Sequence, residues 1–494
     1  MNDNIDSTNA ILDCELCIIG AGIGGLNALH SASSYLKATD RVVLVDQHPL
    51  PGGMWQDTYE FVRLHQPHPM FTAGNIAWKK RMPAEHLAYR HEVTEQFAHC
   101  LNELRHRVDL VTLFEHIYQG HREFDDIVEI DILKPHAQGA VKIRAKRLIK
   151  ATGYNVKPAP PLSLSSSEIH STSPTEAVFL GEEMASSNTP ILIVGGGKTA
   201  MDTAHALCQR FPGREIRMVV GQGVMFFNRD TFFKTGIMRW IGGVVFFEGF
   251  LDLALRFNGS NFDQVNQYRL KKYGLALTKA PQQFHVGVIS TEELALIRSG
   301  LSEVIEDYLD DIVDTPAGPK AILRSGREFD LPAGSWIINC TGLIARQNVE
   351  YEPYISDTGR VLSINMTSMP FFLTSYCGYF LTHLMYREAL LSTPLYAADM
   401  TELVVKGKAA VGCVAESATI LNVLLIMKAL PVQVFNDCLI DTNRWYPLPR
   451  RLPIVLRFML NNQRFASQCQ QALDCFSSNS GISIAPLPHV CRQI

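Results

Sequence analysis

Two stretches of the chain repeat one pattern, in which an apolar run leads directly into a glycine-rich turn. The first stretch starts at the apolar run Cys14 to Gly20, continues through glycines and small residues to about Ser33, and reaches another apolar run at Arg41 to Asp46. Short apolar runs bounded by turns indicate buried strands, and the small residues between them indicate a helix. The pattern predicts a βαβ unit near the start of the chain.

The second copy of the pattern starts after Pro190. The apolar residues ILIV precede GGGKTA, which spans Gly195 to Ala200. A helical pattern then extends to about Gln209, and a strand is expected from Glu215 to Val220. Two such units in one chain predict an α/β protein with two Rossmann-like dinucleotide-binding folds.

Two further apolar runs end in a small-residue turn. Leu148 to Gly153 ends in ATG and Trp336 to Gly342 ends in CTG, and a hairpin pattern at Ile322 to Leu331 precedes the second run. We expect each run to be a strand that returns to the sheet of its own unit. The second fold would then be inserted into the first.

The charge balance of the 494 residues is nearly even. Lys and Arg total 45, Asp and Glu total 49, and the formal net charge is −4. Because no basic tract is present, the positive surface that a phosphate backbone requires is missing. We expect a small-molecule partner and no nucleic acid.

The 11 cysteines are scattered and odd in number, unlike a disulfide framework. Reduced thiols and a polar first decapeptide without an apolar core predict a cytoplasmic protein without an export signal. Cys14 and Cys17 form C-x-x-C, a redox pair or half a metal site, but their place in a strand favours core cysteines. His65 and His68 lack a third ligand, so no metal site is expected.

Two apolar stretches resemble membrane segments in composition. Gly236 to Phe257 is interrupted by charged residues, and Ala418 to Leu430 is too short to span a bilayer. We predict buried or amphipathic helices and no integral membrane segment; the alternative is contact with a membrane surface or an apolar substrate. The aromatic segment from Tyr379 to His383 is expected to pack in the core, with cavity lining as its alternative.

The first glycine turn has the spacing G-x-G-x-x-G at Gly20, Gly22 and Gly25. These glycines allow a tight turn, a close approach of the backbone to a pyrophosphate, and close packing of helix on strand. Asp46 ends the next strand, where a carboxylate can accept hydrogen bonds from ribose hydroxyls. We predict a dinucleotide site, with FAD expected by analogy to other long chains that open with this fold. The alternative is a glycine-rich turn with a solvent-facing Asp.

The second turn is G-x-G-x-x-A, with Gly195, Gly197 and Ala200. Gly221-Gln222 stands where a site that prefers NADH would place an acid. Without that carboxylate a ribose 2′-phosphate meets no repulsion, so we favour NADPH and keep NADH as possible.

The nearest candidate cations for such a phosphate are Lys198 and Arg229. Both could instead be ordinary surface charges.

Two redox nucleotides in one chain predict hydride transfer from a nicotinamide to a flavin.

After Asp46 the chain reads Pro51-Gly52-Gly53-Met54-Trp55 and later Leu64-His65-Gln66-Pro67. Here it resembles the class B flavoprotein monooxygenases, in which G-G-x-W and L-H-x-P occur after the acid. The resemblance covers roughly residues 14 to 345. It implies that the second nucleotide is NADPH, held by Gly195, Gly197 and Ala200. The residues implied to hold FAD are Gly20, Gly22, Gly25, Asp46, Gly53 and Trp55.

The same resemblance implies an activity. In the family, reduced flavin captures O2 as a C4a-(hydro)peroxide, and one oxygen atom passes to nitrogen, sulfur or carbon of a small substrate. His65 would face the flavin edge as a catalytic residue, and its alternative role is to cap a turn before Pro67.

The family signature ahead of the second turn is replaced here by Leu164 to Pro174, which keeps only its histidine. Two other functions therefore stay open: an NAD(P)H-dependent flavin oxidoreductase or dehydrogenase without oxygenation, and a catalytically degenerate flavin-binding protein.

The predicted domain organisation combines these features, and a homodimer through the extra helices is possible. The predicted parts are residues 1–160 (FAD-binding domain, first part), 161–334 (NAD(P)H-binding domain, with a helical insertion at about 225–300), 335–400 (FAD-binding domain, second part) and 401–494 (helical C-terminal extension).

Overall fold

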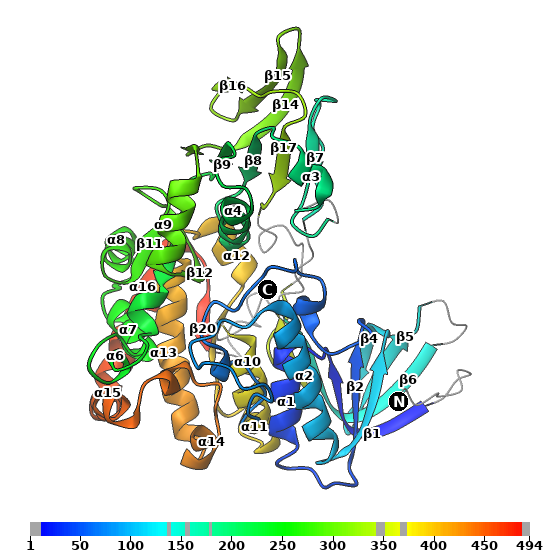
Figure 1. Ribbon diagram of the computed structural model, residues 1–494. Helices are drawn as coiled ribbons and strands as arrows, with labels where there is room; N and C mark the ends of the chain where they lie inside the picture. Colours follow the sequence, from blue (N-terminus) through cyan, green and yellow to red (C-terminus); the bar gives the residue numbers. More distant parts are fainter. Residues whose placement is uncertain are drawn as a thin grey trace.

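A seven-stranded sheet centred on β1 forms the lower right of the molecule in Figure 1. The computed structural model describes residues 11–135, 140–153, 159–176, 180–341, 351–365 and 373–486. The strands of this sheet are β1 (Ile11–Ile19), β2 (Arg41–Asp46), β3 (Asp109–Phe114), β4 (Ile117–Glu123), β5 (Val128–Leu133), β6 (Ala140–Gly153) and β18 (Val361–Asn365). β3, β2, β1, β6 and β18 are parallel, and β4 and β5 add an antiparallel ribbon on β6.

Both faces of β1 are buried. Leu16 and Ile18 pack in the cluster that includes α1 (Ile23–Ala32) and α2 (Arg90–Arg105), whereas Cys17 and Ile19 pack in the cluster on the opposite face. Successive side chains of a strand point to opposite faces, so the part of β1 that is covered on both faces, Leu16 to Ile19, is apolar. The first predicted βαβ unit is confirmed: β1, α1 and β2 follow the expected order.

The second sheet is parallel throughout, in the order β13-β9-β8-β17-β7. Its strands are β7 (His170–Thr172), β8 (Ile191–Val194), β9 (Ile216–Val219), β13 (Glu303–Ile305) and β17 (Trp336–Asn339). Helix α4 (Lys198–Arg210) connects β8 to β9 and packs against α9 (Thr291–Gly300). The second βαβ unit is therefore also confirmed.

The strand at Trp336 pairs with β8, so the prediction that it returns to the sheet of its own unit is confirmed, and β18 returns to the first sheet. The predicted domain boundary at residue 335 is wrong, because it separates this strand from the second sheet. The end of the predicted CTG turn, Gly342, lies outside the described residues. The predicted hairpin is confirmed, because β15 (Gly318–Leu323) pairs in antiparallel fashion with β16 (Glu328–Asp330), beside β14 (Leu309–Thr315).

The segment from about 225 to 300 is not purely helical. It contains a small sheet in the order β11-β10-β12, made of β10 (Val224–Asn228), β11 (Gly274–Ala276) and β12 (Gln283–Ile289). The prediction of a helical insertion is wrong for these strands. The apolar run of β10 lacks alternation and cannot be distinguished from helix by period, whereas β12 does alternate and its signal was missed. The helices of the segment are α5 (Arg229–Phe232), α6 (Met238–Ile241), α7 (Phe246–Ala254) and α8 (Phe262–Tyr273).

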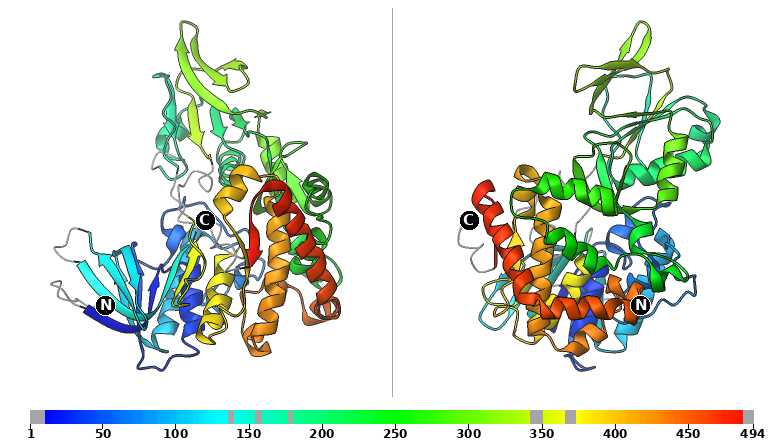
Figure 2. Two further views of the ribbon diagram at one scale, coloured as in Figure 1. Left: turned by 180° about the vertical axis from the view of Figure 1, so that it is seen from behind. Right: turned by 90° about the vertical axis from the view of Figure 1, so that its left-hand side faces the viewer.

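The residues after 400 form helices that pack on this segment. Their bounds are α12 (Met400–Lys406), α13 (Val411–Ala429), α14 (Val432–Asn436), α15 (Leu448–Leu460) and α16 (Asn462–Ser480). One apolar core includes residues of α7, α13 and α16, and we call this assembly the helical unit. Figure 2 shows its green and orange-red helices side by side. A short strand, β20 (Ile484–Pro486), pairs with β19 (Tyr396–Ala398).

Within the described residues, α13 alone is long and apolar enough to cross a bilayer. It is packed between α7 and α16, and its Glu416 forms a fully buried ion pair with Arg269 of α8 at 2.7 Å. These are the contacts of a core helix. The aromatic segment also packs in the core: Tyr379 stacks on His30 of α1 and lies edge-on to His383.

Candidate active site

The first glycine turn is held tightly between β1 and α1. Gly20 has φ +103°, and a Cβ there would lie 2.4 Å from the carbonyl oxygen of Ala151. A Cβ on Gly25 would lie 1.8 Å from the oxygen of Gly20. Neither position can accept a side chain without movement of the backbone, so the tight turn and the close helix–strand contact of the motif are present.

The N-terminus of α1 is open to an anion. Gly22 is the N-cap, no side chain caps the helix, and its first turn contains no acid. The first N–H groups of a helix lack partners within the helix and favour negative charge. A pyrophosphate fits this position, as the FAD prediction requires.

The predicted G-G-x-W segment packs directly on this turn. Gly53 has φ +54°, and a Cβ there would lie 3.0 Å from the Cα of Gly22, while the N–H of Gly52 donates to Ala21 O at 3.1 Å. Trp55 follows in a short 3-10 helix, Gly53–Gln56, and lies edge-on to Phe71. The structure thus gathers Gly20, Gly22, Gly25, Gly53 and Trp55 at one end of the first sheet.

Asp46 is buried beside the same turn. Its carboxylate accepts the N–H of Ala21 at 2.5 Å and binds the imidazole of His48 at 2.9 Å. The other nitrogen of His48 lies 2.8 Å from Asp57 Oδ2. The hydrogen bond to Asp46, supported by that to Asp57, raises the pKa of His48 to about 9, so the ring is cationic at neutral pH. Sequence reasoning missed His48, although it follows the predicted acid by two residues.

The second glycine turn is built in the same way but is more open. Gly195 has φ +131°, and a Cβ there would lie 2.4 Å from Cys340 O. Gly197, the N-cap of α4, differs: a Cβ on it would meet nothing within 4 Å. Ala200 is buried on the inner side of α4. The backbone at Gly197 is therefore accessible to a phosphate, as the second site requires.

The end of β9 carries no acid at the expected position. Gly221 donates its N–H to Asp307 O at 2.9 Å and lies against the ring of Tyr308. The Asp307 carboxylate is engaged by the Ser325 hydroxyl and by the N–H of Tyr308.

Residues of the two folds meet at a junction beside the second glycine turn. Lys198, at the start of α4, forms an ion pair with Asp202, and the hydroxyl of Tyr59 donates to that carboxylate at 2.8 Å. Tyr59 comes from the segment after the first glycine turn, so this contact joins the two folds.

His65 lies at the same junction. Arg229 donates from Nε to the His65 carbonyl oxygen at 2.8 Å and forms an ion pair with Glu293 of α9 at 3.0 Å. Removal from water, together with the charges of Lys198 and Arg229, holds the pKa of His65 well below its usual value. The imidazole is thus neutral at pH 7.

The two predicted cations are both paired with carboxylates. Burial opposes the ionisation of Glu293, but Arg229 and Lys198 outweigh it and lower the Glu293 pKa to about 2. Sequence reasoning missed Glu293 and Asp202. The four-residue spacing of Lys198 and Asp202 on a helix is the signal that could have shown the second.

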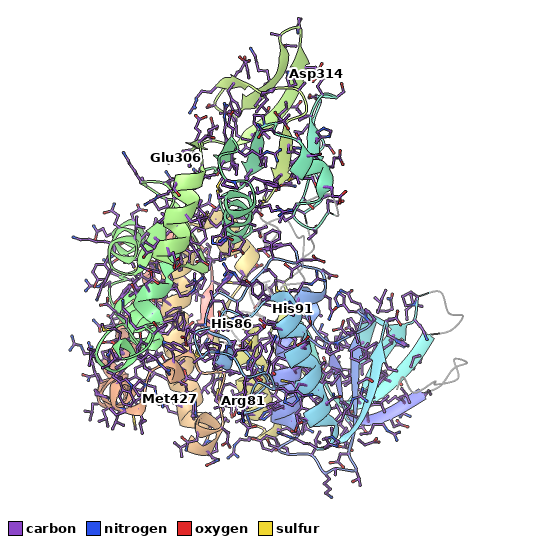
Figure 3. The ribbon with its side chains drawn as sticks, in the orientation of Figure 1. Arg81, His86, His91, Glu306, Asp314 and Met427 are labelled. Carbon is purple, nitrogen blue, oxygen red and sulfur yellow. The ribbon has the colours of Figure 1, made fainter. Side chains whose placement is uncertain are left out.

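Other predicted features lie away from the junction. Ser166 and Ser167 lie in the segment that replaces the family signature, and both bind Asp314 of β14. Figure 3 shows Asp314 at the top of the molecule, well above His86 and His91 near its centre. Cys14 and Cys17 are buried free thiols, and burial raises the pKa of both. Among the described residues, no three His, Cys, Asp or Glu side chains are grouped for a metal ion.

Comparison with known proteins gives one family match. Residues 14–228, which include both glycine turns, match the pyridine nucleotide-disulphide oxidoreductase family. No curated protein matches the chain.

Several solved structures are similar. A flavin-containing monooxygenase from Stenotrophomonas maltophilia has 14% identity and a TM-score of 0.46, over 76% of this chain and 98% of that one. The bacillithiol disulfide reductase Bdr of Bacillus cereus has 10% identity and a TM-score of 0.46, over 76% and 99%. The NADP+-bound cyclohexanone monooxygenase from Rhodococcus sp. Phi1 has 12% identity and a TM-score of 0.46, over 79% and 87%.

The resemblance to class B flavoprotein monooxygenases fits the family match, which includes both glycine turns. The turns have the glycines, open helix N-termini and buried Asp46 that two dinucleotides require. Residues 14–228 carry the fold of the pyridine nucleotide-disulphide oxidoreductases, and the protein is a flavin-dependent oxidoreductase with sites for FAD and a nicotinamide dinucleotide.

Proposed function

We propose that this enzyme is an NADPH-dependent monooxygenase that inserts one oxygen atom of O2 into the nitrogen, sulfur or carbon of a small organic substrate. The supporting observation is the junction itself, where His65 contacts Arg229 and lies close to Lys198 at the second glycine turn. FAD, when bound, supplies electron transfer from the nicotinamide to O2. In the balanced reaction NADPH gives a hydride, solvent gives a proton, and the second oxygen atom leaves as water.

His65 is the proposed catalytic residue. A neutral imidazole can donate one hydrogen bond and accept another without releasing a proton into the site. Its low pKa keeps it in this state throughout the physiological range. In a site that excludes water, such a donor can stabilise negative charge that develops on oxygen while few protons are available to release H2O2.

NADPH is the proposed electron donor. No carboxylate follows β9 directly to repel a 2′-phosphate, and Lys198 and Arg229 add positive charge near the second turn. Binding of a phosphate by either cation would require it to share or leave its carboxylate partner.

A cytoplasmic location is also proposed. Nine cysteines of the described residues are free thiols, as expected in a reducing compartment: Cys14, Cys17, Cys100, Cys208, Cys340, Cys413, Cys438, Cys469 and Cys475.

The experiment combines oxygen labelling with a variant of His65. The protein, purified with FAD, is given NADPH, 18O2 and a panel of amines, thioethers and activated carbon acids. We expect a product that contains one labelled oxygen atom. H2O2 formation without any labelled product would instead indicate an oxidoreductase without oxygenation, and failure of NADPH to bleach the flavin would indicate a binding protein.

In the same assay, His65→Ala should raise the amount of H2O2 released per NADPH consumed by roughly ten-fold or more. The reason is that the variant lacks one hydrogen-bond donor that stabilises negative charge on oxygen. His106→Ala is the control, because this exposed residue caps the far end of α2. Equal coupling in the wild type and in His65→Ala would contradict the role of His65.

A further inference from the structure

Helices α6 and α15 carry a large exposed apolar surface. On α6 and the residue before it, Ile237, Trp240 and Ile241 are 75%, 57% and 72% exposed, and Leu460 at the end of α15 is 83% exposed. Contiguous apolar surface of this kind is uncommon on monomeric proteins and marks an interaction site.

The apolar residues of α15 form one stripe. Leu448, Leu452, Val455, Leu456 and Met459 follow the spacing i, i+4, i+7, i+8 and i+11, which places them on one side of a helix. All five are exposed, and Phe458 is the sole buried residue of this helix. The stripe therefore points to solvent, while the opposite side of the helix contacts the helical unit.

The two helices form a continuous surface. Arg450 of α15 donates to the carbonyl oxygens of Gly242 and Gly243, which follow α6, at 2.9 and 3.0 Å. Arg239 of α6 donates from Nε to Trp445 O, ahead of α15, at 2.9 Å. Figure 1 shows both helices together at the lower left edge of the molecule. We call this surface the α6–α15 face.

The α6–α15 face also carries local positive charge. Residues 231–247 and 442–473 contain no Asp or Glu, although the whole chain has a net charge of −4. The Lys and Arg residues of these two segments are Lys234, Arg239, Arg444, Arg450, Arg451, Arg457 and Arg464. Arg457 and Arg464 are exposed next to the apolar stripe.

We propose that the α6–α15 face binds the surface of an anionic lipid bilayer, so that the enzyme is a peripheral membrane protein. An amphipathic helix with an apolar stripe, flanking arginines and a neighbouring tryptophan lies in the interface plane of a membrane. Each basic residue near an anionic leaflet strengthens the binding. The apolar side chains enter the acyl region and the arginines bind lipid phosphates.

A second copy of the chain fits this face less well. A two-fold contact would place the same patch on itself. The arginines of one copy would then oppose those of the other, with no carboxylate in either segment to offset their repulsion. The charge pattern thus favours a negative surface of lipid.

The first test is sedimentation of the FAD-loaded protein with vesicles. We expect binding to phosphatidylcholine mixed with phosphatidylglycerol, little binding to phosphatidylcholine alone, and release by high salt. Arg457→Glu combined with Arg464→Glu should weaken binding by about ten-fold or more. Leu456→Ser combined with Ile241→Ser should weaken it similarly, and the control Val405→Ser, which alters an apolar side chain of α12 that is 75% exposed, should not.

The second test uses Trp240, which is the exposed member of the five tryptophans. Lipids with a spin label in the acyl chain should quench its emission in anionic vesicles, and Trp240→Phe should remove the quenched component. Failure to bind anionic vesicles would overturn the proposal, as would binding without quenching. A third outcome is a protein that does not bind vesicles but dimerises in solution. If Leu456→Ser combined with Ile241→Ser abolishes that dimer, the partner of this face is a second copy of the chain. Because these readouts do not need turnover, they are independent of the proposed oxygenation.

Discussion

The two glycine turns share one backbone design but differ in how much surrounds them. At the first, Gly53 packs on Gly22, and Asp46 accepts the N–H of Ala21. At the second, Gly197 faces open space. The first turn is braced by neighbouring backbone, as suits a cofactor that stays bound, whereas the second has free space beside it, as suits a nucleotide that enters and leaves in each cycle.

The comparison also separates two kinds of glycine. Gly20, Gly25 and Gly195 are required by the fold, because a Cβ on each would overlap a backbone atom. Gly197 is not required by packing, so its lack of a side chain is better explained by a ligand. Substitutions at these positions should therefore affect different properties.

The largest effect is expected from Gly25→Ala. The new Cβ would lie 1.8 Å from the oxygen of Gly20, so α1 must move away from β1. We expect a loss of about 3 kcal/mol or more in the free energy of unfolding, with loss of bound flavin. Thermal unfolding and the visible flavin absorbance measure both. A yellow variant of wild-type stability would mean that the first turn is less constrained than its geometry indicates.

A smaller effect is expected from Lys198→Gln. Loss of a charged contact to a phosphate costs about 1.4 kcal/mol or more, a roughly ten-fold rise in KM for NADPH. KM for NADH should change much less, since NADH has no 2′-phosphate. Steady-state kinetics with both nucleotides decide this, and Lys408→Gln on the loop before α13 is a charge-matched control. Equal changes for the two nucleotides would remove Lys198 from the phosphate site.

Gly197→Ala tests the open turn more mildly. Its φ of −80° accommodates alanine and the added methyl group enters open space, so the poorer N-cap is the main cost and stability should fall by about 1 kcal/mol or less. The methyl group would however separate the backbone from a pyrophosphate. We expect KM for NADPH to rise by about five-fold, equivalent to about 1 kcal/mol, with flavin content unchanged. Unchanged kinetics would argue against nucleotide binding at this turn.

The smallest effect concerns His48, for which the second turn has no described counterpart. Its pKa in the folded protein, about 9, is above the ordinary value of 6.5, so folding favours its protonated form. The resulting stability is fully present below pH 6.5 and is lost as the pH rises through 9. Because the ring is partly solvated, we expect about 1 kcal/mol or less. Urea unfolding of wild type and His48→Gln across this range should converge at high pH; a constant difference would exclude titration of His48.

Both βαβ units could be predicted from the sequence almost to the residue, because an apolar strand, a glycine turn and a helix are local signals. The prediction of β2 at Arg41 to Asp46 matches the structure at both ends. Strand β10 could not be distinguished from a helix by its period, and its partners β11 and β12 are distant in sequence. His65, Lys198 and Arg229 were found individually, but their meeting at one junction, with Glu293, depends on tertiary contacts that no local pattern records.

The helical unit joins two parts of the chain that are far apart, the segment after residue 224 and the helices after residue 400. Its core residues Phe250 and Leu251 of α7 are synthesised long before Cys469 and Phe476 of α16, with which they share that core. During translation the apolar side chains of α7 therefore stay partly unpacked until the ribosome has synthesised α16, more than a hundred residues later. Such late closure leaves apolar surface of α7 exposed during synthesis, so a chain truncated before α16 should aggregate.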